Sequence, residues 1–131
     1  MTWLVVCIVV QTSKGGAMRI LIIDDDGAVL RMTRRMLASE GHQADAAATA
    51  ADAFRHLAAK SYDTILCDLH LPDVAAATFL SKLSPLDAAR VVFATGGECS
   101  QADADFLAGK RVLYKPFTPA QLRDAIAHEA A

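Results

Sequence analysis

The stretch Thr64-Ile65-Leu66-Cys67-Asp68 governs how the rest of this sequence is interpreted. Its apolar residues run directly into a carboxylate, and a short unbroken apolar run is typical of a strand buried on both faces of a parallel sheet. Asp68 would then stand where open α/β sheets bind their ligands, and could serve there as a nucleophile or a metal ligand. Taken alone, the stretch is more often an aspartate that ends a strand and opens a turn, here over residues 69–73.

Similar apolar runs recur along the chain and alternate with helical patterns. Strands are expected at residues 20–23, 64–68, 91–94 and 112–114, with a weaker one at 43–47. Helices are expected after Gly27 up to Glu40-Gly41, after the capping residue Thr49, at about 75–83, at 101–108 and from Thr118 onward. Five strands that alternate with helices predict one α/β domain, in which a parallel sheet carries helices on both faces.

Some local expectations accompany this pattern. The apolar face of the first helix is expected to carry Val29, Met32, Thr33, Met36 and Leu37, and its arginines are expected mostly in solvent. Ser84-Pro85 is expected to end the third helix. Three histidines are expected at the surface, namely His42, His56 and His128.

The N-terminal residues differ in character from the rest. Residues 3–10 are an apolar run rich in β-branched side chains, and residues 11–17 contain Gly15-Gly16 and are typical of a linker. The run is too short for a membrane helix, which needs about 20 residues, and no Lys or Arg precedes Trp3 as in a signal peptide. We therefore expect residues 1–17 to be an appendage and residues 18–131 to form the domain, without membrane insertion.

Length, charge and cysteine content narrow the class of protein. A chain of 131 residues has the size of one domain. Its 13 basic and 15 acidic residues form no basic stripe, so binding to DNA is not expected. Its three cysteines cannot all pair and lack the spacing of metal ligands, which favours a reducing, cytoplasmic compartment.

Four of the expected strands end in residues that carry chemistry, namely Asp24-Asp25, Asp68, Thr95 and Lys115. The carboxyl ends of parallel strands meet at one edge, so these groups should gather there. Three neighbouring carboxylates repel one another and attract a hard divalent cation such as Mg²⁺. Lys115 would offer a positive charge, and Thr95 a hydroxyl donor, to a group that arrives with negative charge. The set predicts a place where a carboxylate accepts a phosphoryl group.

Taken in order, these stretches resemble the receiver domain of two-component response regulators. They are Ile20-Leu21-Ile22-Ile23-Asp24-Asp25, Asp68-Leu69-His70-Leu71-Pro72, Ala94-Thr95-Gly96 and Lys115-Pro116-Phe117, and the match runs from Met18 to the C-terminus. The contexts of Thr95 and Lys115 also resemble receivers attached to hybrid histidine kinases. The resemblance implies a flavodoxin-like fold whose five parallel strands lie in the order 2-1-3-4-5.

The resemblance also implies roles for individual residues. Asp68 would be the phospho-acceptor, Asp25 a direct Mg²⁺ ligand, and Asp24 a metal-site residue that acts indirectly or through a water. The backbone carbonyl of His70, and not its imidazole, would complete the protein ligands. Thr95 would bind a phosphoryl oxygen.

Lys115 has two implied roles, because it would pair first with Asp68 and then with the phosphoryl group. The resemblance further implies a cis bond between Lys115 and Pro116, and an approach to Asp68 that Gly96 leaves open. The sequence departs from the family where Ala75-Ala76 replace a usual Asp-Gly pair, where the short segment 95–115 predicts a short helix, and where Val112 replaces an aromatic residue. These departures concern the usual signalling surface.

The resulting hypothesis is a single-domain receiver. It would take a phosphoryl group from a histidine kinase or a histidine phosphotransfer protein onto Asp68 in a Mg²⁺-dependent reaction, and would act through a downstream protein partner. It would not be an enzyme beyond self-catalysed phosphotransfer and autodephosphorylation. The alternatives are a pseudo-receiver that is never phosphorylated and the receiver part of a hybrid histidine kinase. A phosphatase with an aspartate nucleophile would need a second carboxylate where His70 stands.

Overall fold

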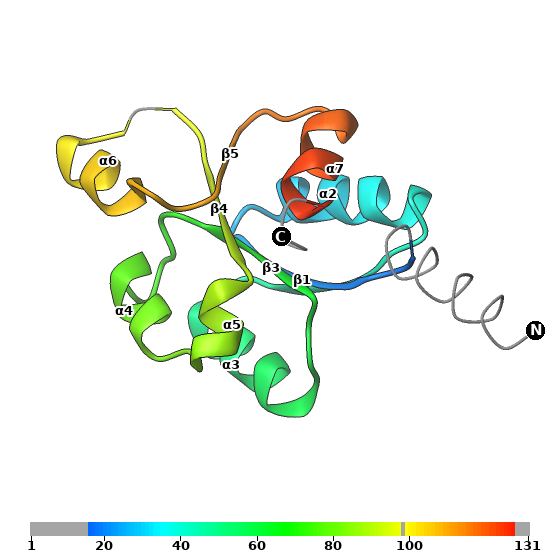
Figure 1. The fold of residues 1–131 in the computed structure, drawn as a ribbon, viewed down its shortest axis with the longest axis horizontal. Helices are drawn as coiled ribbons and strands as arrows, with labels where there is room; N and C mark the ends of the chain where they lie inside the picture. The colour runs from blue at the N-terminus through cyan, green and yellow to red at the C-terminus, as the bar shows by residue number, and fades with distance from the viewer. Residues whose placement is uncertain (1–15, 98, 128–131) are drawn as a thin grey trace, which may run out of the picture.

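The computed structural model describes residues 16–97 and 99–127, which form a parallel sheet between two layers of helices (Figure 1). The strands are β1 (Arg19–Ile23), β2 (Gln43–Ala47), β3 (Thr64–Asp68), β4 (Val91–Thr95) and β5 (Val112–Tyr114). They lie in the order β2-β1-β3-β4-β5, and every neighbouring pair is parallel. The predicted fold is therefore confirmed, including the weak strand at 43–47.

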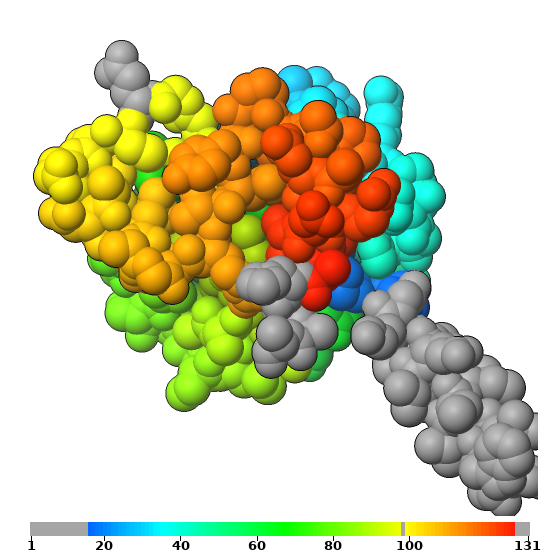
Figure 2. All heavy atoms as spheres, turned by 45° about the horizontal axis from the view of Figure 1, so that its top comes forward, coloured from blue at the N-terminus to red at the C-terminus, as the bar shows by residue number. Residues whose placement is uncertain are grey.

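Helices cover both faces of the sheet, as predicted. They are α2 (Gly27–Ser39), α3 (Ala50–Ala59), α4 (Ala76–Ser81), α5 (Pro85–Ala89), α6 (Gln101–Leu107) and α7 (Pro119–Ala127). One apolar cluster packs α2 and α7 against one face, and a second packs α3, α4 and α6 against the other. In Figure 2, α7 (red) lies between α6 (yellow) and α2 (cyan). None of the helices in the described part of the chain is long and apolar enough to cross a membrane.

The unbroken apolar runs place the central strands inside. Every residue of β3 and β4 is buried, and only Arg19 of β1 is exposed. Side chains alternate between the two clusters, with Ile20 and Ile22 on the α2 side and Leu21 and Ile23 on the α3 side. A run that is apolar at every position therefore fills two cores at once, as strands of a parallel sheet do.

The helix predicted at about 75–83 is present between β3 and β4, but the structure has a second helix there that the sequence analysis missed. The first helix, α4, ends at Ser81, and a second helix, α5, begins at Pro85. The Ser84 hydroxyl accepts a hydrogen bond from the backbone N–H of Asp87 at 3.2 Å, which caps α5. Proline suits the first position of a helix because no intrahelical hydrogen bond is needed there. Ser84-Pro85 thus starts a helix as well as following one.

The apolar face of α2 lies as predicted, with one exception. Thr33 and Leu37 are buried and Met36 packs against the core, but Met32 is 38% exposed. Leu30, which was not predicted on this face, packs against the core as well. The helix begins directly after the strand-end aspartates because the Asp26 carboxylate accepts hydrogen bonds from the first backbone N–H groups of α2.

The predicted position at the surface is wrong for two of the three histidines. His42 and His56 are half-buried, not at the surface. His42 is drawn inward because its Nδ1 accepts a hydrogen bond from the backbone N–H of Met18 at 3.0 Å. His128 lies outside the described residues.

Two buried hydroxyls lack hydrogen-bond partners within the described segments, and they belong to Thr33 and Thr64. An unsatisfied buried polar group costs about 1–3 kcal/mol. We expect Thr33→Val to increase the free energy of unfolding by about 1 kcal/mol, measured by denaturant titration. The exposed Thr78→Val is the control and should change it by less than about 0.5 kcal/mol. A clear loss of stability in Thr33→Val would mean that this hydroxyl does bind a partner.

The domain boundary can be tested by truncation, although the apolar run at 3–10 lies outside the described residues. The hydrogen bonds of the sheet begin at Met18, whose carbonyl accepts from the N–H of Gln43 at 2.9 Å. We expect a chain of residues 18–131 to unfold with a free energy within about 1 kcal/mol of that of the full chain, because surface changes are usually small. Thermal melts of both chains would measure this, and a loss of several kcal/mol would place residues 1–17 in the core.

Candidate functional site

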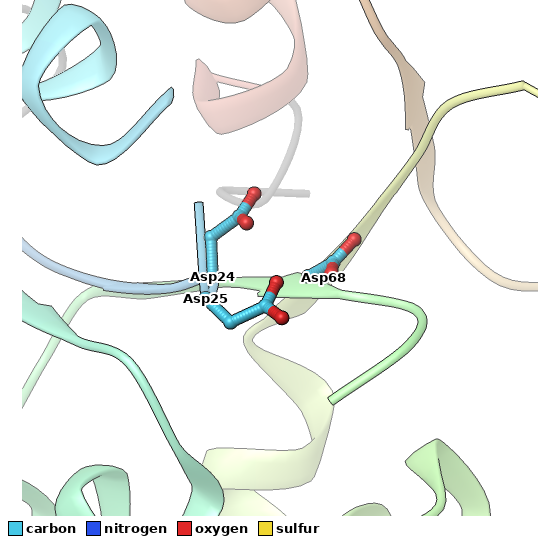
Figure 3. A group of neighbouring side chains, drawn as sticks. All are labelled: Asp24, Asp25 and Asp68. Atoms are coloured by element: carbon cyan, nitrogen blue, oxygen red, sulfur yellow. The ribbon is translucent and has the colours of Figure 1, made fainter. Parts of the chain in front are cut away.

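Three carboxylates gather at the carboxyl edge of the sheet (Figure 3). Asp24 and Asp25 follow β1, and Asp68 ends β3. The register pairs Ile23 with Cys67, which brings the next residues of the two strands together. One oxygen from each carboxylate lies within 4.8 Å of the others. The acidic cluster predicted from the strand ends is therefore present.

Asp24 is held most firmly of the three. Its residue is 3% exposed, and its Oδ1 accepts a hydrogen bond from the N–H of Asp26 at 2.9 Å. Its Oδ2 accepts from Lys115 Nζ at 2.6 Å, and its own N–H donates to the Ala47 carbonyl at 3.0 Å. Asp25, by contrast, is exposed. The cluster thus has a fixed inner carboxylate and an outer one that faces solvent.

Lys115 joins the fourth and fifth strands to this cluster. Its N–H donates to the Thr95 carbonyl at 2.8 Å, and its Nζ also donates to Asp68 Oδ1 at 3.1 Å. The Lys115–Pro116 bond is cis, as expected. The side-chain stem passes Gly96 so closely that a Cβ on that glycine would lie 3.2 Å from Lys115 Cβ. A larger residue at position 96 would therefore crowd the lysine.

Burial and charge act against each other on the ionisation of these groups. Burial raises the pKa of the Asp68 carboxyl, while Lys115 opposes this and the other two aspartates add to it. Burial alone would lower the pKa of Lys115, but its bonds to Asp24 and Asp68 outweigh that effect and raise it. The ammonium of Lys115 is shared between two carboxylates. Lys115 therefore stays charged, while the negative charge of Asp68 is only partly neutralised.

The donor set fits a magnesium ion. Three carboxylates and one lysine carry three negative charges and one positive charge when ionised, which leaves two negative charges for a divalent cation. Mg²⁺ prefers hard oxygen ligands and is commonly held by one or two carboxylates together with water. The exposed Asp25 leaves room for such waters. The acidic cluster is thus consistent with a Mg²⁺ site.

Thr95 reaches the same edge but makes a different contact. It ends β4, is 2% exposed, and lies beside Tyr114 in the register with β5. Its Oγ1 is 3.6 Å from Cys99 Sγ, and no hydrogen bond joins it to the three aspartates within the described segments. The contact between Cys99 and Thr95 was not predicted from the sequence.

The imidazole of His70 points away from the acidic cluster, as expected. The side chain is 63% exposed, and its Nε2 is 3.3 Å from Asp103 Oδ2 on α6. The backbone of His70 forms an isolated bridge with Ala75, which closes the loop after β3.

Asp73 is a residue that the sequence analysis missed. It lies in the same loop, and its two carboxylate oxygens accept hydrogen bonds from the N–H groups of Ala50 and Ala51, both at 3.0 Å. These bonds lower the pKa of Asp73. Because its partners lie more than 20 residues earlier, at the start of α3, the sequence around Asp73 carries only the signal of a turn.

Comparison with solved structures supports both the fold and the family. A receiver domain protein (CheY-like) from Methanospirillum hungatei is 30% identical with a TM-score of 0.76, over 87% of this chain and 94% of that one. A receiver domain from Clostridium thermocellum is 24% identical (TM-score 0.72, 85% and 92% covered). The chemotaxis response regulator CheY4 of Vibrio cholerae is 18% identical (TM-score 0.72, 86% and 98% covered). The last two bear on the fold alone.

Comparison at the level of sequence gives the family directly. None of the curated proteins matches the chain significantly. The family model described as the response regulator receiver domain matches residues 20–127, which include the acidic cluster and all of the sheet except Arg19, the first residue of β1. The protein therefore belongs to the response regulator receiver domain family.

Proposed function

We propose that this receiver accepts a phosphoryl group from a phosphohistidine onto Asp68 in a Mg²⁺-dependent reaction. The observation that carries the proposal is Lys115 Nζ, which donates to Asp24 and Asp68 at once inside a cluster of three carboxylates. A lysine that only neutralised a buried aspartate would need one partner. Lys115 Nζ lies where it could exchange a hydrogen bond to a carboxylate for one to an incoming phosphoryl group.

The reaction is a displacement at phosphorus. A carboxylate oxygen of Asp68 attacks as the phosphorus–nitrogen bond breaks, and the electron pair of that bond stays on the imidazole nitrogen of the donor, which takes up a proton. Because Asp68 Oδ1 is bonded to Lys115, the geometry holds the carboxylate in one orientation. Catalysis of this kind depends on positioning and on electrostatic stabilisation.

We assign the remaining roles to groups at the same edge. Asp24, Asp25, Asp68 and the backbone carbonyl of His70 would hold the Mg²⁺. The ion would supply positive charge to the oxygens of the transferring group. Lys115 would donate to one of these oxygens, and the Thr95 hydroxyl would leave Cys99 to donate to another.

The phosphohistidine would come from a partner protein, because receiver domains pair with histidine kinases. An apolar hollow of about 330 Å³ lies beside Lys115, between α2 and the turn after β5. Its lining includes Val29, Pro116 and the exposed Met32. We propose that a side chain next to the partner's phosphohistidine fills this hollow. The exposed Met32 would then contribute to this contact.

Phosphorylation of Asp68 can be tested with a small donor that contains a phosphorus–nitrogen bond. We expect phosphoramidate with Mg²⁺ to add one phosphoryl group to the full chain, detected by intact mass, and excess chelator to abolish the reaction. Asp68→Asn keeps the shape of the side chain but removes the nucleophile, so it should not be labelled. Removal of a covalent nucleophile usually abolishes the chemistry it performs.

A matched control comes from α6. Asp105→Asn changes an exposed aspartate that accepts a hydrogen bond from Gln101 and lies outside the cluster. It should be labelled like the parent. Labelling of Asp68→Asn at the parental rate would assign the phosphoryl group to another residue, and no labelling of the parent would favour a pseudo-receiver.

The response to phosphorylation should be concentrated in the loop from Thr95 to Gln101. Gly97 in this loop has a φ of +68°, which only glycine adopts freely, whereas Val112 is stiff at χ1 and packs against the core. With beryllofluoride as a phosphoryl mimic, we expect large amide shift changes at Gly96 and Gly97 and small ones at Val112. Equal changes along Val112–Tyr114 would contradict this expectation.

A further inference from the structure

We propose that Asp73 is a positioning residue for the metal site, because it ties the loop that follows Asp68 to the start of α3. The inference rests on the proposed function, since it concerns the same Mg²⁺ site. Asp73 itself is not a member of the acidic cluster, and its carboxylate faces α3. Its role would be to hold the backbone of the loop, and with it His70.

The loop over residues 69–75 is fixed near the sheet but projects at its tip. At its base, the N–H of Leu69 donates to the Ala94 carbonyl at 2.9 Å, and Leu69 is buried. His70 and Ala75 then bridge each other. Asp73 lies between these two residues, at the tip. Movement of the tip would therefore also move the peptide group of His70, because His70 is bridged to Ala75.

Asp73 fixes this tip with a two-point contact. Its two oxygens accept from two successive N–H groups of α3, each at 3.0 Å. A helix N-terminus carries partial positive charge, which strengthens a hydrogen bond to a carboxylate. The helix is itself anchored, because Ala50 and Ala53 are fully buried in the core. Two bonds to a rigid partner restrain rotation of the loop as well as its distance from α3.

The contact serves both the loop and α3. Helix α3 has a cap of its own, since the Thr49 hydroxyl accepts from the N–H of Asp52 at 3.1 Å. Ala51 is exposed, so water could satisfy its N–H without Asp73, whereas Ala50 is buried and its N–H depends on Asp73. Asp73 thus ties the tip of the loop to a buried part of α3.

On its other side the loop is held more weakly. Among the described residues, the polar contact there is His70 Nε2 to Asp103 Oδ2 at 3.3 Å, and the His70 side chain is largely exposed. Exposed pairs of this kind contribute little. Leu71 and Val74 pack against the apolar core, but such packing is not directional. We infer that the Asp73 hydrogen bonds orient the loop and keep the His70 carbonyl available to the ion.

The test measures Mg²⁺ binding directly, by titrating the full chain and following the amide shifts of Asp25 and His70. Removal of a group that orients a metal ligand typically lowers the affinity for the metal by 10–100-fold. We expect Asp73→Ala to weaken Mg²⁺ binding by about tenfold. Asp73→Asn keeps one acceptor oxygen and should lose less. In phosphoramidate labelling, the Mg²⁺ concentration needed for half the maximal rate should rise in parallel, while the rate at saturating Mg²⁺ changes little.

Thr49→Ala is the matched control, because it removes a cap from the same helix without touching the loop. It should lower the melting temperature and leave Mg²⁺ affinity unchanged. Unchanged Mg²⁺ affinity in both Asp73 variants, or an equal loss in Thr49→Ala, would overturn the inference. Failure of the proposed function would be a separate result. It would appear as labelling of Asp68→Asn at the parental rate, whatever the Mg²⁺ affinity of the Asp73 variants. If Asp73→Ala does not fold, Asp73→Asn provides the same comparison.

Discussion

The sharing of one lysine by two buried carboxylates is the interaction on which the site depends. Lys115 Nζ lies 2.6 Å from Asp24 and 3.1 Å from Asp68, and all three groups are mostly withdrawn from water. Charges in such surroundings are tolerated only when they are paired and hydrogen-bonded. The pairing with Lys115 makes the buried carboxylates tolerable in the folded state. The negative charge that remains still attracts a cation.

The parallel sheet is what makes this sharing possible. Asp24 and Lys115 are 91 residues apart in the chain and come from strands on opposite sides of β3 and β4. Parallel strands send all of their carboxyl ends to one edge, so a single register aligns β1, β3, β4 and β5 there. The sheet also buries the first part of each strand, which fixes the start of each loop while leaving the loops free to differ. The reactive side chains therefore stand on the rigid strand ends. The loops that follow can vary without moving them.

Much of the fold and of the site could be predicted from short stretches. The runs Ile20–Ile23 and Ile65–Cys67 are apolar at every position, and only strands buried on both faces need that pattern. The errors arose where a local signal has two structural outcomes. Ser84-Pro85 can end one helix and also cap the next, and Met32 lies at the edge of the apolar face of α2, where a side chain can be either covered or exposed. His42 was misplaced because its partner, the N–H of Met18, belongs to a distant part of the sequence.

The order of residue types along the chain is enough to predict that carboxylates, a hydroxyl and a lysine stand at the ends of parallel strands, because unbroken apolar runs indicate buried strands and their alternation with helices indicates a parallel sheet. The contacts that give these groups their working arrangement come from folding. Asp73 meets the start of α3, His70 meets Asp103, and Thr95 meets Cys99 through side chains whose directions depend on loop paths and packing. No periodicity or spacing encodes such contacts, since each joins loops or helix ends whose relative positions are set only when both sides of the sheet have been covered.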